Sequence, residues 1–263
     1  MCLHPFVAGL GKLYNDAQVK VAAASGISPG GLSCPHVPYV GSRYDKACPR
    51  ILYVGRTTYG WRDTTLKRVL DEGWSYTKLA EESDLFIRGR VIPACSGVRP
   101  EDPYYSPFWR AIYLLTAATQ SQSDTLWIEK DEVASRRAFE SIAWMNVNAI
   151  GTEMGTHVVR AKLGHWLCCQ LPVVRLAIEN LKPRPDVVVL STGKRYDHYV
   201  QEMLGGVPAL NGATELVETC VNRIPLLRPK YHFQGLSHED LEHVYARLRA
   251  IVTRSPSHVD CRH

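Results

Sequence analysis

The sequence predicts an α/β fold, a three-layer α/β/α sandwich around a central, mainly parallel sheet of four strands. Short apolar runs recur along the chain, as expected for strands that are covered on both faces. Helix-compatible segments separate these runs, and the chain contains no internal repeat or low-complexity tract. Strands that alternate with helices in this way are typical of a parallel sheet.

Each of the four strands is predicted from one apolar run. The first, "ILYVG", is wholly apolar up to its glycine. A weaker strand or loop is expected around residues 215–220. The four runs are residues 51–55, 142–147 ("IAWMNV"), 186–192 ("DVVVLST") and 224–233 ("IPLLRPKYHF").

Helices are predicted between these strands and at both ends of the chain. One of them has a clear start, because Ser106 can cap it and Pro107 can open it, and it would bury Phe108, Ile112 and Leu115. The last helix is expected after Ser237, which with Asp240 resembles a capping box that has Asp in place of the usual Glu. The other predicted helical segments are residues 6–24, 64–82, 158–180 and 195–204.

The chain is predicted to form one domain with an extension in front of it. Residues 1–45 would contain the first helix and a Gly/Pro-rich crossing, residues 46–255 the α/β domain, and residues 256–263 a tail. A chain of 263 residues with 45% hydrophobic residues can bury one sizeable core.

Composition narrows the class of partner only slightly. The net charge of +5 favours an anionic partner without identifying it. The eight cysteines form no CxxC pair and no Cys/His spacing suited to a metal, so we expect neither a metal nor a cofactor. The sequence has no apolar run near membrane-spanning length and no leader-like start. We therefore expect an intracellular, cytoplasmic or nucleoid-associated protein with free thiols and no membrane partner.

Glycines and polar residues lie at or just after the end of each predicted strand, at the edge where a parallel sheet binds ligands. They include Gly55 and Tyr59 after the first strand, Asn146 at the end of the second, and His232 after the fourth. Gly193, Lys194 and Arg195 follow the third strand. An amide can pair with a flat heterocycle, an aromatic ring can stack on it, and a histidine can donate to a carbonyl oxygen that gains charge. This combination suits a nucleobase.

Four motifs in the same order resemble the uracil-DNA glycosylase superfamily. The family's first motif, a glycine, a polar residue, an acid, a proline and a tyrosine after a strand, is similar to "GRTTY", residues 55–59. Its strand-borne asparagine corresponds to Asn146, and its third strand to "VVVLSTGKRYD". The last family motif, histidine-proline-serine-proline-leucine-serine, resembles "HFQGLS", residues 232–237. Together the motifs cover about three quarters of the chain.

The resemblance implies a role for each matching residue. Asn146 would read the edge of a flipped-out base, with Asn148 as a substitute on the same side of the strand, and Tyr59 would wall the pocket. His232 would donate to the base oxygen as the glycosidic bond breaks. Leu236 would wedge into the base stack and Ser237 would contact a phosphate. Apart from the resemblance, Lys194 and Arg195 flank the same strand ends, so together with Gly193 they could contact the DNA backbone, or they could form a solvated basic face.

One position departs from the family pattern. Thr57 stands where the family most often has an acid or amide that positions water, and a threonine hydroxyl cannot act as a base near neutral pH. Asp63 could replace it if the loop folds back. The aromatic residue that would stack on the base could be Tyr104, Tyr105 or Phe108.

Structural roles compete with these functional ones. Asn146 could tie a strand end to a loop, His232 could cap the final helix, and Leu236 could be a hydrophobic staple before that helix. The expected function is a monomeric, metal-free DNA glycosylase that acts on single- or double-stranded DNA and removes a damaged or non-canonical base, with uracil first. The alternatives are a weakened relative that binds nucleic acid or a nucleotide without cleavage, and an enzyme that acts on a free nucleotide or nucleoside.

Overall fold

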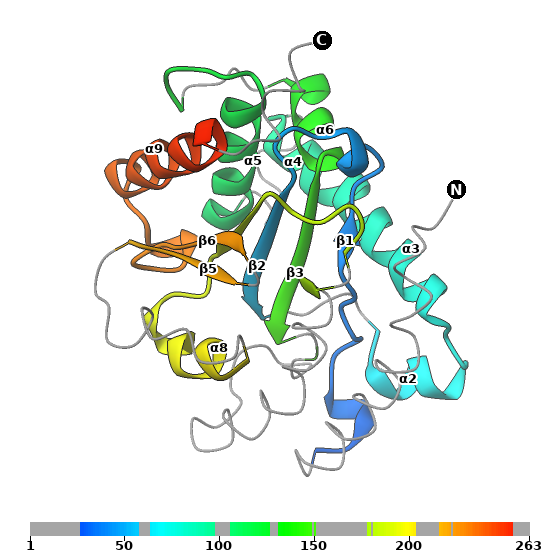
Figure 1. The fold of residues 1–263 in the computed structure, drawn as a ribbon. Helices are drawn as coiled ribbons and strands as arrows, with labels where there is room; N and C mark the ends of the chain where they lie inside the picture. The colour runs from blue at the N-terminus through cyan, green and yellow to red at the C-terminus, as the bar shows by residue number, and fades with distance from the viewer. Residues whose placement is uncertain are drawn as a thin grey trace.

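The computed structural model of the chain has an α/β fold built on one mixed sheet of six strands (Figure 1). Its strand order is β1-β3-β2-β4-β6-β5. The structure describes residues 27–57, 64–97, 106–126, 131–148, 150, 178–179, 181–203, 216–221 and 223–254. The predicted N-terminal helix at residues 6–24 and most of the predicted helix at 158–180 lie outside these residues.

The four inner strands are the four that the apolar runs predict. They are β2 (Ile51–Thr57), β3 (Ile142–Asn148), β4 (Val187–Leu190) and β6 (Ile224–Arg228), and neighbouring members of this set are parallel. All seven residues of β3 and all four of β4 are buried, which explains their nearly unbroken apolar sequence.

The sheet is larger than the predicted four strands because each edge carries an antiparallel strand. β1 (Tyr39–Val40) pairs with β3, and β5 (Val217–Val221) pairs with β6. β5 falls where the weaker strand is expected. β1 has only two residues and lies within the Gly/Pro-rich crossing, so it has no periodic pattern that could reveal it.

The crossing belongs to the same core as the domain that follows it. Cys34, Val37, Tyr39 and Tyr44 are almost fully buried members of the main hydrophobic cluster. The predicted boundary between residues 45 and 46 therefore does not separate two cores. The short 3-10 helices η1 (Pro29–Gly31) and η2 (Tyr44–Lys46) lie in this segment.

One helical group packs together beside the sheet. It contains α4 (Ile92–Cys95), α5 (Pro107–Gln120), α6 (Glu132–Glu140) and α9 (His238–Arg254), and α9 also packs against β4 and β6 (Figure 1). Tyr53 of β2 bonds through its hydroxyl to Thr116 of α5. Tyr245 of α9 donates to the Ala118 carbonyl of α5. Long-range hydrogen bonds therefore connect α5 both to the sheet and to α9.

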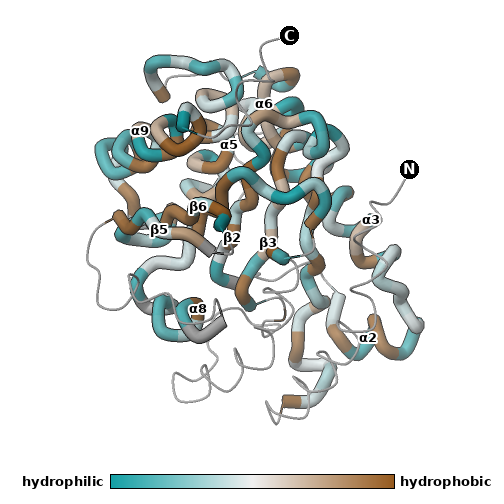
Figure 2. The backbone as a smooth tube through the Cα atoms, viewed as in Figure 1, coloured by the Kyte–Doolittle hydropathy of each residue, from teal (hydrophilic) through white to brown (hydrophobic). Residues whose placement is uncertain are grey.

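The predicted helix starts are confirmed by their caps. The Ser106 side chain accepts from the Trp109 backbone N–H at the start of α5, and Phe108, Ile112 and Leu115 are buried. At the start of α9, Asp240 donates its backbone N–H to the Ser237 hydroxyl and accepts from the Ser237 backbone N–H. Along α9 the hydropathy alternates between hydrophilic and hydrophobic, as an amphipathic helix requires (Figure 2).

The segment predicted as one helix over residues 64–82 forms two. α2 (Leu66–Asp71) ends before Gly73, whose φ of 59° stops a right-handed helix, and α3 (Tyr76–Phe86) starts after the Ser75 cap. A π-helical turn, η3 (Ile87–Val91), leads from α3 into α4. The predicted helix at 195–204 is observed as the 3-10 turn η4 (Lys194–Tyr196) followed by α8 (Asp197–Met203).

Two further findings concern the thiols and the membrane. Cys34, Cys95 and Cys220 are in the thiol form, but Cys48 is disulfide-bonded, so the expectation of free thiols is wrong for Cys48. Among the helices of the described residues, none combines the length and the apolar composition that crossing a bilayer requires.

Candidate functional site

The candidate site lies at the carboxyl ends of the four parallel strands. Their direction is the same, so the residues that follow them meet at one edge of the sheet. Gly55 of β2 is in register with Asn146 of β3, and Thr57 with Asn148. The predicted strand-end residues of β2 and β3 are therefore neighbours, although they are about 90 positions apart in the sequence.

Gly55 allows two side chains to lie against the β2 backbone. A Cβ atom at residue 55 would stand 2.3 Å from Asn146 Oδ1 and 3.2 Å from the Phe108 ring. The first distance is shorter than real Cβ contacts, so any larger residue would force Asn146 to shift, and the second would require the Phe108 ring to move by a few tenths of an ångström. Asn146 and Phe108 are nearly buried, with 4% and 8% of their surface exposed.

Phe108 and His232 form a stacked pair. Their ring centroids are 5.3 Å apart and their planes differ by only 3°. Phe108 lies in the first turn of α5, which the Ser106 cap fixes, and His232 lies just after β6. A helix start and a strand end, distant in sequence, therefore contribute the two rings.

His232 is held as a neutral imidazole. Its Nδ1 accepts a hydrogen bond of 3.3 Å from the Gln234 backbone N–H, so the proton of the neutral ring is assigned to Nε2. Burial, and secondarily the positive charge of Arg56, lowers the pKa of His232 to about 3. The ring caps the 3-10 helix η6 (Phe233–Gly235) and not the final helix. Near neutral pH its Nε2–H is thus an uncharged donor.

A second glycine, Gly193, lies after β4 and allows close approach of Arg56 from β2 and of the backbone at His232. Gly193 has a φ of 69°, and a Cβ there would lie 2.9 Å from the His232 backbone nitrogen and 3.0 Å from Arg56 Nη2. Arg56 Nε donates to the Thr192 carbonyl at 2.6 Å, and its guanidinium lies 5.7 Å from the centre of the Tyr196 ring. The guanidinium is therefore fixed between two strand ends.

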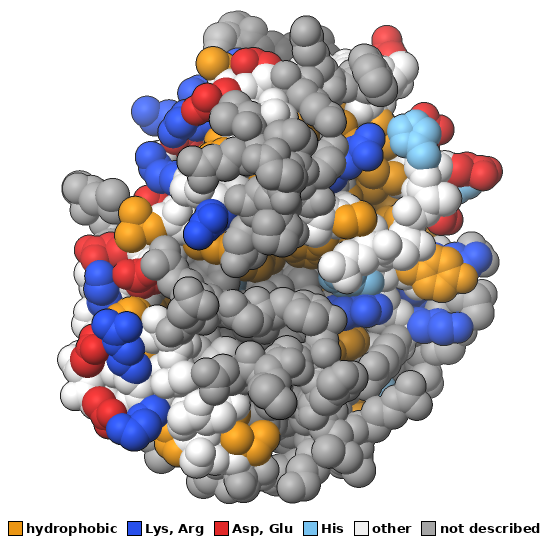
Figure 3. All heavy atoms as spheres, turned by 180° about the vertical axis from the view of Figure 1, so that it is seen from behind, with side chains coloured by type: hydrophobic (Ala, Val, Ile, Leu, Met, Phe, Trp, Pro, Cys, Tyr) orange, Lys and Arg blue, Asp and Glu red, His pale blue; other side chains and the backbone are white. Residues whose placement is uncertain are grey.

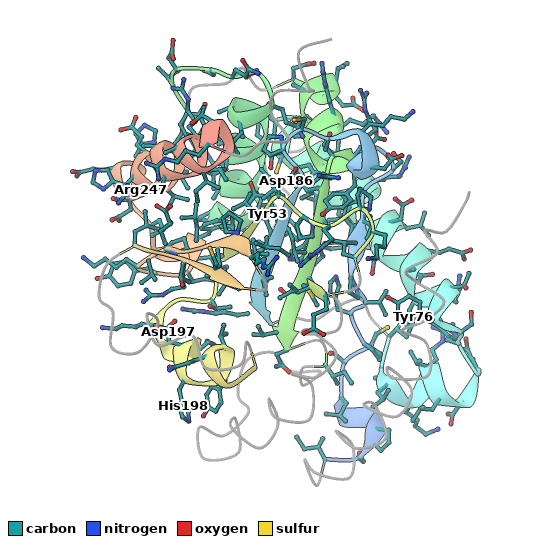
Figure 4. The ribbon with its side chains drawn as sticks, viewed as in Figure 1. Tyr53, Tyr76, Asp186, Asp197, His198 and Arg247 are labelled. Atoms are coloured by element: carbon teal, nitrogen blue, oxygen red, sulfur yellow. The ribbon has the colours of Figure 1, made fainter. Side chains whose placement is uncertain are left out.

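A buried ion pair lies next to this cluster. Arg228, the last residue of β6, has no exposed surface and places Nη2 3.0 Å from Asp197 Oδ2 at the start of α8. Arg228 Nη2 and Asp197 Oδ2 form an ion pair, but their geometry does not meet the criteria for a hydrogen bond. In Figure 4, Asp197 lies on the side of α8 toward the sheet and His198 on the opposite side. The pair anchors the segment that follows β4.

The remaining predicted site residues have varied positions. Asn148 is buried, Lys194 is exposed, and Leu236 is partly buried against the core. The Ser237 hydroxyl donates to Asp240, so both its backbone N–H and its side chain are engaged in the α9 cap. Tyr59 and Asp63 lie outside the described residues, and for Thr57 and Arg195 only the backbone is described.

The structure places one residue in the site, Arg56, to which the sequence had assigned no role. Arg56 directly follows Gly55, and a basic residue next to a strand-ending glycine is the signal that could have identified it. Phe108 was one of three aromatic candidates, and it is the one whose contacts with the site are described. Tyr104 and Tyr105 lie outside the described residues.

The described residues show which chemical groups the site can offer to a ligand. In the part of the chain that the structure describes, no group of three His, Cys, Asp or Glu residues could hold a metal ion. On the face shown in Figure 3, described Lys and Arg side chains lie on both sides, and those on the right lie near histidine and hydrophobic side chains. The site can thus offer an amide, an aromatic ring, a neutral N–H donor and a guanidinium to a ligand.

Comparison with known proteins identifies no relative. No family model matches the chain, and searches of curated proteins and of solved structures find no similar protein.

Proposed function

We propose that the protein is a uracil-DNA glycosylase-like enzyme that binds DNA, flips out a damaged or non-canonical base, and hydrolyses its N-glycosidic bond. Uracil is the first candidate base. The observation that carries this proposal is the neutral imidazole of His232, stacked in parallel with Phe108 beside the Asn146 amide. The fold would be a three-layer α/β/α sandwich in which the four inner strands form the functional sheet.

The two parallel rings support the binding of a flat ligand. If they are separated in height by about 3.5 Å, a centroid distance of 5.3 Å places them about 4 Å apart sideways. A base that stacks on Phe108 on the same side as the imidazole would then be coplanar with His232. In that plane the Nε2–H could donate directly to a carbonyl oxygen of the base.

The amide of Asn146 supports base selection. An amide side chain offers one acceptor and two donors, so it can pair with adjacent carbonyl and N–H groups of a pyrimidine. Its oxygen lies against the β2 backbone at Gly55. Asn148, two residues further along β3, stays the substitute for this role.

Bond cleavage would proceed without a metal. The bond between the sugar C1′ and the base nitrogen breaks, its electron pair stays on the base, and the His232 donor stabilises the developing negative charge. Water then bonds to C1′ and releases a proton. Thr57 or Asp63 would orient this water. Thr57 cannot act as a base, and this favours the alternative function, a weakened relative that binds nucleic acid or a nucleotide without cleavage.

The DNA would be contacted around the same edge of the sheet. Gly193, Lys194 and Arg195 would face phosphates, Leu236 would fill the vacated space in the base stack, and Ser237 would contact a phosphate if its bonds to Asp240 open. The protein would act as a monomer in the cytoplasm or on the nucleoid.

An abasic-site assay on uracil-containing single- and double-stranded DNA tests the proposal. We expect base release that His232→Ala lowers by orders of magnitude, because the substitution removes the donor at the leaving oxygen. His243→Ala is the matched control, since His243 is exposed on α9, and its activity should equal that of the wild type.

Other results would reject the glycosylase activity. Salt-sensitive DNA binding without base release, even at high enzyme concentration, would leave the non-cleaving alternative. Splitting of a free nucleoside without DNA binding would indicate a nucleoside enzyme. Full activity of His232→Ala would mean that the site is elsewhere.

A further inference from the structure

We propose that the exposed ring of Tyr231 forms a second subsite, on which the base next to the flipped nucleotide stacks when the DNA strand is unpaired. Tyr231 directly precedes His232 in the sequence. The inference rests on the proposed function and deepens it, because it assigns a binding role to a side chain outside the motifs that suggested that function.

Tyr231 is an aromatic residue whose side chain lies at the surface. Of its surface, 41% is exposed, and the other exposed large hydrophobic side chains of the described residues are aliphatic, namely Leu70, Leu85 and Val133. The flat face of an aromatic ring is the surface on which a nucleobase of any kind can stack. Tyr231 therefore offers a stacking surface that no other exposed side chain of the described residues provides.

The backbone places this ring beside the proposed base site. A Cβ atom at Gly193 would lie 3.4 Å from the Tyr231 carbonyl carbon and 2.9 Å from the His232 backbone nitrogen. His232 has an extended backbone, with φ −61° and ψ 147°, and neighbouring side chains of an extended segment point to different sides. The His232 ring faces inward against Phe108, whereas the Tyr231 ring faces solvent. Tyr231 thus lies on the outer side of the site.

Local contacts limit the freedom of the Tyr231 ring. Lys230 Nζ lies over the ring, 5.3 Å from its centre. The Cβ atom of Tyr231 lies beside the η6 turn, 3.7 Å from the position that a Gly235 Cβ would occupy. A ring that is already restricted loses less conformational entropy when a base stacks on it. The position of the ring is therefore partly set before a ligand binds.

The covalent structure of DNA brings a second base to this ring. Consecutive nucleotides of one strand are joined through a single phosphate, so the base next to the flipped one must lie on the outer side of the site. In a duplex, that base is covered by the next base pair on one face and by Leu236 in the vacated space on the other. In an unpaired strand, it can leave the stack and turn one face toward Tyr231. Tyr231 would therefore contribute to the binding of unpaired DNA.

A binding cycle between Tyr231 and the neighbouring base tests the inference. The probes are single strands with one 2′-fluoro-2′-deoxyuridine, which resists hydrolysis, and with or without a base at one position beside it. Fluorescence anisotropy measures their affinities. For the wild type, loss of the base on one of the two sides should lower the affinity about 5- to 150-fold, the range for stacking of a base on an aromatic side chain. Tyr231→Ala should bind the complete strand more weakly by a similar factor and should not respond to the missing base.

Further variants separate stacking from other effects. Tyr231→Phe keeps the ring and should keep the response to the missing base. Trp74→Ala is the matched control, because Trp74 also has a lysine over its ring, with Lys78 Nζ 5.6 Å from the ring centre. Trp74 precedes α3, which packs against β1 at the edge of the sheet far from β6, so this variant should respond as the wild type does.

Two measurements on Tyr231→Ala exclude a general defect. When the probe strand is paired with its complement, this variant should bind it as tightly as the wild type does, since the neighbouring base is then covered. Urea denaturation should give the same midpoint for both proteins, because the substituted side chain is exposed.

The results for binding and for cleavage are independent. A response to the missing base that Tyr231→Ala abolishes, without base release in the abasic-site assay, would support the subsite and reject the glycosylase activity. Base release by a protein that binds single strands equally well with and without the neighbouring base would overturn the inference and leave the proposed function. An equal response in the wild type and in Tyr231→Ala would also overturn it, because the base would then bind elsewhere.

Discussion

Asp197→Asn is expected to destabilise the protein strongly, because it removes the partner of a fully buried charge. Arg228 has no exposed surface, and its Nη2 lies 3.0 Å from Asp197 Oδ2, which is itself nearly buried (Figure 4). Desolvation by burial lowers the pKa of Arg228 and raises the pKa of Asp197, and each partner's charge opposes this shift. The cost of burying both charges therefore exceeds their attraction.

The expected magnitudes follow from this imbalance. Loss of one member of a buried pair costs about 3–5 kcal/mol, because the other charge stays buried without compensation. Replacement of both members, by Asp197→Leu with Arg228→Met, should be nearly neutral or stabilising by about 1–4 kcal/mol, since both desolvation costs disappear.

Urea denaturation of the single and double variants at neutral pH measures these differences. Asp71→Asn is the control, because it removes one member of the exposed Lys67–Asp71 pair and should change the free energy of unfolding by no more than about 1 kcal/mol. If Asp197→Asn costs no more than this control, the buried pair does not stabilise the junction between β6 and α8, and the reasoning is wrong.

Two further predictions concern pH and close packing. Burial lowers the pKa of His36 and of His232 to about 3, so at a pH between about 3 and 6.5 the unfolded chain binds two more protons than the folded protein. As the pH falls below 6.5, the free energy of unfolding should therefore decrease by about 1.4 kcal/mol per pH unit for each histidine. Equal stability at pH 7.5 and pH 5 would contradict this. Gly55→Ala places a Cβ 2.3 Å from Asn146 Oδ1 and should lower the free energy of unfolding, measured by urea denaturation, by about 1–3 kcal/mol. It should also abolish binding of the proposed base. Gly89→Ala, with open space around its Cβ, is the control, and equal effects of the two substitutions would refute the packing argument.

The sequence predicted the inner sheet well because strands buried on both faces have apolar runs that can be recognised within a few consecutive residues. β2 and β3 are largely apolar, and their limits differ from the predicted ones by at most two residues. The start of α5 was equally clear, because the Ser106 cap and Pro107 act within one turn. β1 was missed because two residues paired across the sheet have no periodicity. α6, capped by Asp131, was not predicted.

The candidate site was predicted in part. Gly55, Asn146, Gly193 and His232 lie at or near the ends of the predicted strands, and the parallel sheet brings them to one edge. The stacking of Phe108 on His232 was not predictable, because α5 and the end of β6 are far apart in the sequence. The disulfide-bonded state of Cys48 was also contrary to expectation.

By itself, the sequence determined the α/β class, the four inner strands and the identity of the polar residues that follow them, since these depend on apolar runs, caps and glycines within a few positions. Only the tertiary structure decided that Arg56 lies beside Gly193 and His232, that His232 is neutral, and that Asp197 and Arg228 are buried together. These properties depend on desolvation and on charges from distant segments, which the order of residues along the chain does not specify.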